Sequence, residues 1–203
     1  MPKYKEILEP DYYYHIYNRA NGNEKLFLND DNYSYFLQKY NHYINPIADT
    51  FTYCLMPNHF HFLVRIKPIS NLTGFGNLSG LDNISKHLSQ QFSNFFNAYT
   101  KAFNKQNNRK GSLFERPFNR IKITTNEYLL NAINYIHQNP VNHGLAENID
   151  DWKYSSYNVF LSNRPTNINR KEIIELFDDI DNFIFYHKTQ SFEKYALEME
   201  LAY

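Results

Sequence analysis

The sequence has almost no cysteine, no long apolar run and no excess charge, and each absence narrows the class of protein. Cys54 is the single cysteine among 203 residues, which excludes a disulfide framework and a zinc site built from several cysteines. A membrane-spanning helix needs about 18 consecutive apolar residues, and the sequence has no such run. The first residues also lack the apolar core of a signal peptide. We therefore expect a soluble cytoplasmic protein with no membrane partner.

Aromatic residues, by contrast, are abundant. They make up 18% of the chain, with 18 tyrosines and 17 phenylalanines against one tryptophan. Hydrophobic residues (42%) are numerous enough to build a core, which excludes a disordered chain. Tyrosine can pack in a core, stack on a nucleobase or act as a nucleophile, so the position of each tyrosine matters more than the total.

Charge is balanced over the whole chain, with 21 basic and 21 acidic residues, but it is uneven locally. The net charge is +3 over residues 1–150, −3 over residues 151–203 and +6 over residues 101–122, where three phenylalanines lie among the cations. Cations interleaved with aromatic rings suit a phosphate backbone with unstacked bases. The solvated end of a helix with its loop has the same composition, so both interpretations stay open. The candidate DNA-binding residues are Arg19, Lys101, Lys105, Arg109, Lys110, Arg116, Arg120 and Lys122.

The spacing of apolar residues predicts the element order β-α-β-β-α-β-α. The predicted strands span residues 12–18, 50–56, 59–66 and 113–123, the last interrupted by Pro117. The predicted helices span residues 30–44, 84–105 and 125–138, with Asn139 and Pro140 ending the last one. Residues 68–82 are predicted to form a flexible loop, and residues 170–181 an acidic amphipathic helix. This order predicts an α+β fold, a ferredoxin-like four-stranded antiparallel sheet with helices packed on one face.

His59 and His61 form a His-x-His pair on the third predicted strand. Residues i and i+2 of a strand point to the same face, so both imidazoles can meet one divalent ion while Phe60 packs on the other side. Two imidazoles beside a tight turn can form half of a metal site. Two histidines on a solvated sheet face are the alternative, and the spacing alone does not separate the two.

Tyr135 and Asn139 are the second candidate pair, because residues i and i+4 share a face of a helix. The amide of Asn139 offers an oxygen ligand beside the Tyr135 hydroxyl. A phenol has a pKa of about 10 and attacks phosphorus only where a site orients it and a divalent ion polarises the phosphate. The alternative is that Tyr135 is a core tyrosine, Asn139 caps the helix and Pro140 ends it.

Six short segments carry a resemblance to a known family. In chain order they are Tyr14–Arg19 (YHIYNR), Cys54–His61 (CLMPNHFH), Gly111–Arg116 (GSLFER), Glu127–Leu130 (EYLL), Tyr135–Leu145 (YIHQNPVNHGL) and Asp151–Tyr157 (DWKYSSY). This ordered series resembles the single-tyrosine HUH transposases, most closely the REP-associated tyrosine transposases, over roughly residues 10–160.

The resemblance implies a metal-dependent endonuclease and strand transferase for single-stranded DNA. Such enzymes cut near imperfect hairpins and leave a 5′-phosphotyrosine and a free 3′-hydroxyl. The family's metal-binding pair, which holds Mg²⁺ or Mn²⁺, maps to His59 and His61, and a third metal ligand maps to Asn139. The family's nucleophile maps to Tyr135. The implied partner is single-stranded or hairpin DNA at the bacterial nucleoid, and both a monomer and a homodimer are compatible with the sequence.

The resemblance also divides the chain into two parts. Residues 1–160 are the predicted HUH transposase-like catalytic domain, and residues 161–203 are a C-terminal extension of unknown role, whose acidic composition argues against a tail that grips DNA. Two other functions stay open at this point. One is a domesticated hairpin- or repeat-binding protein without transposition activity, and the other is a metalloprotein that uses the same histidines on a different substrate.

Overall fold

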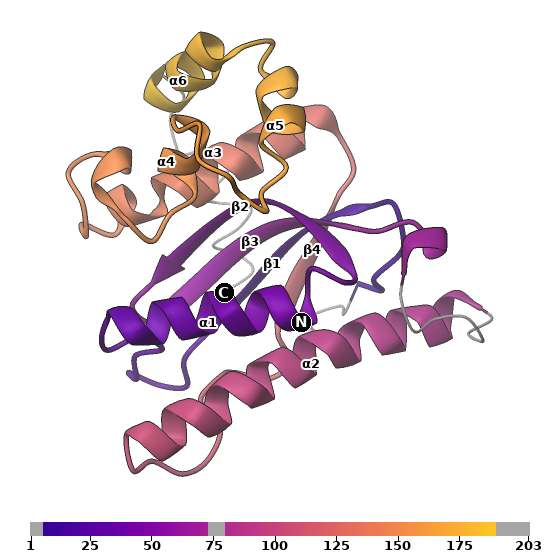
Figure 1. Cartoon of the computed structure of the whole chain (residues 1–203), viewed down its shortest axis with the longest axis vertical. Helices are drawn as coiled ribbons and strands as arrows, with labels where there is room; N and C mark the ends of the chain where they lie inside the picture. Colours follow the sequence, from indigo (N-terminus) through magenta and orange to yellow (C-terminus); the bar gives the residue numbers. More distant parts are fainter. Residues whose placement is uncertain (1–5, 73–79, 190–203) are drawn as a thin grey trace.

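The computed structural model describes residues 6–72 and 80–189 and contains one four-stranded antiparallel sheet (Figure 1). Its elements are β1 (Tyr13–Arg19), α1 (Asp30–Tyr43), β2 (Ala48–Met56), β3 (His59–Ile66), η1 (Ile69–Asn71), α2 (Leu81–Gln106), β4 (Asn119–Ile123), α3 (Asn126–Asn142), η2 (Ile149–Asp151), α4 (Tyr157–Phe160), α5 (Arg170–Leu176) and α6 (Ile180–Thr189). The strand order is β2-β3-β1-β4, and each neighbouring pair is antiparallel. The predicted α+β class and ferredoxin-like sheet are confirmed.

Helices cover both faces of this sheet. Figure 1 shows α1 and α2 on one side, as expected, and α3 to α6 on the other. The expectation that the helices lie on one face therefore holds only for α1 and α2. The reason is visible in β3, which is buried at every position from His59 to Val64. Successive strand residues point to opposite faces, so a strand that is buried at every position needs packed elements on both faces of the sheet.

Two predicted boundaries near prolines differ from the structure. The fourth strand begins at Asn119 instead of residue 113, because Pro117 has no N–H to donate to a ladder. Upstream of it, Phe114 keeps an isolated bridge to Ala20. Helix α3 continues through Pro140 to Asn142. This proline lies in the last turn, where its missing N–H removes one helical bond only.

The predicted acidic helix 170–181 is in fact two helices, α5 and α6. The break falls at Asp178, whose φ of +69° lies in the left-handed region and cannot continue a helix. Of the predicted loop 68–82, residues 73–79 lie outside the described residues. Within the described ranges, no helix is long and apolar enough to cross a bilayer.

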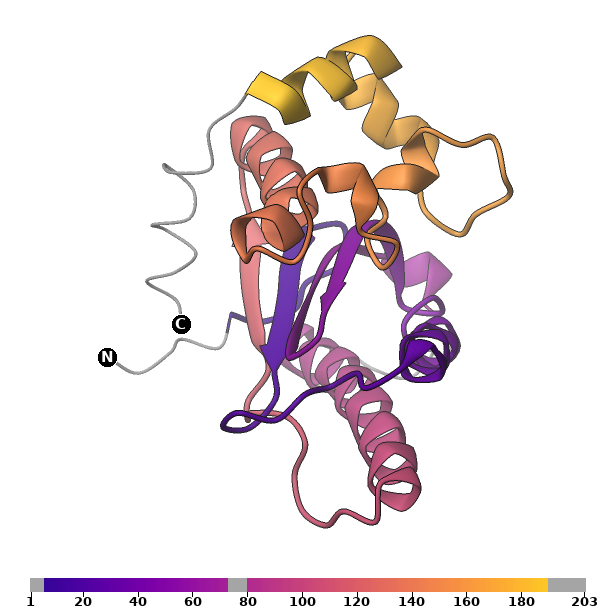
Figure 2. The ribbon, with the colours of Figure 1, turned by 90° about the vertical axis from the view of Figure 1, so that its left-hand side faces the viewer.

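The described part of the C-terminal extension packs onto α3 instead of standing apart. Figure 2 shows α6, in yellow, above the end of α3. Phe183 and Ile173 are fully buried in one core cluster with Ile133 and Ile136 of α3. The core on this face of the sheet therefore contains residues from both predicted parts of the chain.

Replacing Phe183 with alanine is expected to lower the free energy of unfolding by about 3–5 kcal/mol, because a fully buried ring leaves a cavity. The matched control is Phe185→Ala on the same helix. Its side chain is 66% exposed, and the expected change is within about 0.5 kcal/mol. Urea unfolding of the three proteins measures both values. Equal stabilities would show that α6 does not contribute to the core.

His187 on α6 makes stability depend on pH. Burial lowers the pKa of His187 to about 4, while its Nδ1 lies 2.8 Å from the Phe183 carbonyl and its Nε2 lies 2.9 Å from Nδ1 of His137. Between about pH 6.5, the ordinary histidine pKa, and pH 4, the unfolded chain binds a proton that the folded protein excludes. The stability that the neutral His187 contributes is therefore fully present above pH 6.5, and it is lost as the pH falls toward 4.

We expect this group to lower the free energy of unfolding by up to about 1.4 kcal/mol per pH unit in that range. Urea unfolding of the metal-free protein at pH 7, 6 and 5 measures the slope. In a His187→Phe variant, the slope of the free energy of unfolding against pH should be smaller by the contribution of one bound proton. An identical pH slope in the variant and the wild type would contradict this role for His187.

Candidate active site

The four predicted site residues converge on the face of the sheet that α3 covers. His59 and His61 point to this face from β3, with their ring centres 5.1 Å apart and their planes at 87°. Tyr135 and Asn139 of α3 lie against them. The Tyr135 ring is 5.5 Å from the His61 ring, and Oδ1 of Asn139 is 3.4 Å from Nε2 of His59. Residues 80 positions apart in the chain thus meet in one cluster.

The Asn139 amide is held so that its oxygen faces His59. Its Nδ2 donates to the Tyr135 carbonyl at 3.0 Å, one turn earlier on α3. On the other side, Nδ1 of His59 lies 2.8 Å from Oδ1 of Asn58. With the hydrogen on Nδ1 donated to Asn58, the lone pair of Nε2 faces the lone pairs of Asn139 Oδ1. Two acceptor atoms that face each other in this way suit a cation between them.

His15 of β1 is a site residue that sequence reasoning missed. Its Nε2 lies 2.9 Å from Nδ1 of His61, with the two rings stacked 5.0 Å apart. A hydrogen on Nδ1 of His61 donated to His15 makes Nε2 of His61 the ring nitrogen that carries the lone pair. Such a partner fixes the orientation and tautomer of a ligating histidine. The available signal was that His15 and Tyr17 are two residues apart on the first strand and therefore share a face. In the structure this is the face of His61, because Tyr17 lies directly opposite His61 in the ladder.

Burial keeps the histidines of this cluster neutral. It lowers the pKa of His59 to about 4, with His143 and Arg19 lowering it further and the neighbouring Asn139 side chain raising it. It lowers the pKa of His15 to about 3 and holds that of His61 well below its usual range, helped by the neighbouring histidines. A neutral imidazole is the form that binds a metal.

This donor set fits a divalent ion. Two ligands that bind one ion side by side at about 2.1 Å lie about 3 Å apart, close to the 3.4 Å between His59 Nε2 and Asn139 Oδ1. Among residues 6–72 and 80–189, no three His, Cys, Asp or Glu side chains are grouped to hold a metal. Within those ranges, the amide oxygen of Asn139, 3.4 Å from Nε2 of His59, is the candidate third ligand beside the two histidines.

Tyr135 is part of the core on this face and also borders the histidines. Its side chain is 3% exposed, and its ring meets those of His15 and His61 edge-on. Tyr17 lies nearby. Burial raises the pKa of Tyr17 to about 12, and the phenols of Tyr135 and Tyr128 raise it further. The structure thus places the predicted nucleophile beside the predicted metal ligands.

The eight candidate DNA-binding cations do not form one uniform surface. Four of them are engaged within the protein: Arg19 with Glu115, Arg109 with Glu24, Arg120 with Ser89 and Lys122 with Glu9. The other four have exposed side chains and are Lys101, Lys105, Lys110 and Arg116. The sequence pattern found the basic stretch but not the acidic partners, which are distant in the chain.

A sheet of this order, with a histidine pair on a central strand and a tyrosine and an amide on the covering helix, is the arrangement that the tyrosine transposase resemblance predicts. The chain is 31% identical over 114 residues to a Haemophilus influenzae protein described as a REP-associated tyrosine transposase. The match covers 54% of this chain and 58% of that relative, so it spans little more than half of the relative's length. No protein-family model matches the chain.

A solved structure supports the fold. The chain is similar to a REP-associated tyrosine transposase bound to a REP hairpin, with a TM-score of 0.59 and 16% identity, over 81% of this chain and 89% of that one. At this identity the likeness shows the fold. Together with the sequence relative, it confirms the resemblance to REP-associated tyrosine transposases that the six motifs carry.

Proposed function

We propose that this protein is a divalent-metal-dependent endonuclease and strand transferase that cleaves single-stranded DNA at or near hairpins. The observation that carries the proposal is the convergence of His59, His61 and Asn139 beside Tyr135. The chain's similarity to a REP-associated tyrosine transposase, and the hairpin bound to a protein of the same fold, supply the substrate class.

Each residue has a distinct task in this reaction. His59, His61 and Asn139 would hold Mg²⁺ or Mn²⁺, and such an ion supplies a Lewis acid that polarises the scissile phosphate. The Tyr135 oxygen attacks the phosphorus and forms a phosphotyrosine, while the bond from phosphorus to the 3′-oxygen breaks. The phenol loses its proton and the leaving 3′-oxygen gains one, so the step needs no nucleotide cofactor. The reverse attack by the 3′-hydroxyl rejoins the strand.

The test of this function is a covalent adduct. Wild-type protein is incubated with hairpin oligonucleotides that carry unpaired flanks, with Mg²⁺, Mn²⁺ or EDTA, and the products are separated on a denaturing gel. We expect a protein–DNA band with either metal and none with EDTA. Tight hairpin binding without any adduct would instead support the second candidate, a domesticated hairpin-binding protein, which the burial of Tyr135 favours.

The exposed lysines of the basic stretch are expected to contact phosphates. Replacing Lys101, Lys105 and Lys110 with alanine should lower the slope of log affinity against log salt by about 2, since each contact to a single strand contributes about 0.7. Filter binding measures the slope over salt concentrations from about 50 to about 200 mM. The control is Lys171→Ala on α5, whose side chain is 87% exposed. If the triple variant keeps the wild-type slope, the DNA surface lies elsewhere.

A further inference from the structure

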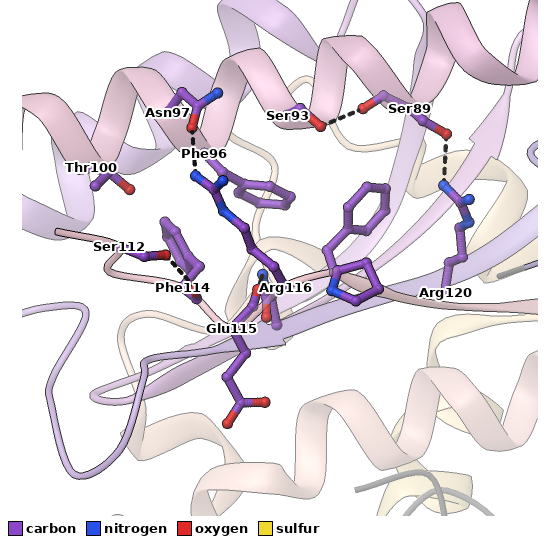
Figure 3. Close-up of a pocket in the computed structure, with 13 residues that line it drawn as sticks. Ser89, Ser93, Phe96, Asn97, Thr100, Ser112, Phe114, Glu115, Arg116 and Arg120 are labelled. Atoms are coloured by element: carbon purple, nitrogen blue, oxygen red, sulfur yellow. Dashed lines mark hydrogen bonds between the residues drawn. The ribbon is translucent and has the colours of Figure 1, made fainter. Parts of the chain in front are cut away.

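A cavity of about 450 Å³ lies between α2 and the segment of residues 112–120 (Figure 3). It is on the face of the sheet away from Tyr135, and the site described above does not use it. Its volume is within the range of small-molecule and nucleotide sites, about 300–1,000 Å³. Its lining combines aromatic rings, neutral polar groups and arginines, three chemistries with separate roles in binding a nucleotide.

Aromatic rings form one side of the cavity. Phe118 lies 5.5 Å from Phe96, and Phe96 lies 5.2 Å from Phe114, measured between ring centres. Phe96 and Phe114 are buried, whereas Phe118 is half-buried. An aromatic face that reaches a cavity is a platform on which an unstacked base can lie, whatever its sequence.

A row of small polar side chains from α2 forms another side. Ser89, Ser93 and Asn97 are spaced four residues apart, so they lie along one face of the helix, and all three line the cavity. Hydroxyl and amide groups can both donate and accept hydrogen bonds. They can therefore pair with the polar edge of a base that lies on the rings.

Two arginines give the cavity a positive charge. Arg116 is exposed, and its Nη2 is 3.4 Å from Oδ1 of Asn97. Arg120 donates to Ser89 Oγ at 2.7 Å and places its guanidinium over the Phe118 ring, while its buried Nε has no partner within the described residues. Among the described residues that line the cavity, the one acidic side chain is Glu115, and it pairs with Arg19. A phosphate is therefore the ligand group that the exposed Arg116 favours.

The cavity and the candidate active site lie on opposite faces of the sheet, at the same end of β1. Asn18 lines the cavity, and the next residue, Arg19, lies directly opposite His59 in the β1–β3 ladder. Successive strand residues point to opposite faces. A DNA strand that crosses this end of the sheet can thus place one nucleotide in the cavity while a phosphate further along reaches His59.

We propose that this cavity binds one unpaired nucleotide of the DNA strand, with its base on Phe118 and its phosphate at Arg116. The inference rests on the proposed function, because that function supplies the single-stranded DNA. The cavity would set which unpaired nucleotide is held, and hence the distance between that nucleotide and the cleaved phosphate.

The experiment is a scan with abasic nucleotides. A hairpin oligonucleotide is first selected for tight binding from a pool with randomised unpaired flanks, and each flanking base is then removed in turn. For the wild type we expect one position at which base removal weakens binding about tenfold, equivalent to about 1.4 kcal/mol. In Phe118→Leu, which keeps an apolar side chain but loses the ring face, the penalty at that position should shrink to about twofold.

Arg116→Ala is a second variant, because an exposed side chain can be removed without loss of the fold. It should weaken binding of the intact oligonucleotide, whereas Lys86→Ala, an equal loss of charge at an exposed position of α2 outside the cavity, should leave both the binding and the abasic pattern unchanged.

Three results would overturn the inference. Normal adduct formation with an abasic penalty that is the same in Phe118→Leu and wild type would refute the cavity's role and leave the proposed function standing. Free deoxynucleoside monophosphates that bind in a Phe118-dependent way, without any abasic effect, would assign the cavity to a free nucleotide. Wild-type protein that binds no hairpin oligonucleotide would overturn the proposed function together with the inference.

Discussion

Replacing Tyr135 with phenylalanine is expected to reduce covalent adduct formation at least about 10³-fold, because a nucleophile's removal eliminates the covalent step. The change deletes one hydroxyl from a ring that packs in the core beside His15 and His61. The fold and the affinity for hairpin DNA should therefore be retained. Denaturing gels of adduct formation and equilibrium binding to the same oligonucleotide measure the two effects separately.

The matched control is Tyr128→Phe on the same helix. Tyr128 also lies near Tyr17, as the electrostatic effect on the Tyr17 pKa shows. The residue four positions after it is Ala132, which offers no ligand, whereas Tyr135 is followed by Asn139. We expect this variant to form the adduct at close to the wild-type rate. Adduct formation by Tyr135→Phe would place the nucleophile on another residue.

Replacing His61 with alanine is the second change with a large expected effect. Mg²⁺ and Mn²⁺ prefer oxygen ligands and bind weakly to sites of few protein groups, so removal of one imidazole should empty the site. We expect metal-dependent cleavage to fall below detection while hairpin binding stays within about threefold, an amount under 1 kcal/mol. Oligonucleotide cleavage across a range of Mn²⁺ concentrations is the measurement.

Three further variants make this result interpretable. His59→Ala should behave in the same way, and its less buried side chain makes it the safer substitution for folding. His15→Ala removes only the partner of His61 and should weaken metal-supported cleavage about 10–100-fold, the usual effect of a lost supporting hydrogen bond. His42→Ala, on the exposed surface of α1, is the neutral control. Full cleavage by His61→Ala would refute the metal assignment.

The sequence predicted the sheet, and it predicted which candidate residues share a face, because both follow local rules. Alternating residues on a strand and the i, i+4 spacing of a helix predicted that His59 and His61, and likewise Tyr135 and Asn139, share a face. It could not predict that His15 joins them, because that depends on β1 lying beside β3 in the sheet. It also predicted that the fourth strand begins at residue 113, whereas β4 begins at Asn119. Local propensity does not show where a neighbouring strand provides a hydrogen-bonding partner.

The DNA-binding candidates show the same limit for charge. Arg109 lies in the most basic stretch of the sequence, yet it pairs with Glu24 and also donates to the Ser112 carbonyl. Its partner is 85 residues away, and a charge count along the chain has no access to that pairing. Within the fold, Arg109 therefore links the loop after α2 to Glu24.

The C-terminal extension also gains a structural role that its sequence did not indicate. His187 of α6 lies 2.9 Å from His137, which lies on α3 between Tyr135 and Asn139 in the sequence. On its other side, the His137 ring lies 2.5 Å from the Thr52 hydroxyl of β2. This fully buried chain of polar groups connects α6, α3 and the sheet. The extension thus helps to fix the helix that carries the proposed nucleophile.

The most direct test of the account is the identity of the residue that becomes linked to DNA. Adduct formed by the wild-type protein with hairpin DNA and Mn²⁺ is digested with nuclease and protease, and the modified peptide is sequenced by mass spectrometry. We predict a 5′-linked nucleotide on Tyr135. A nucleotide on any other of the 18 tyrosines would contradict the account, even in a protein that cleaves DNA.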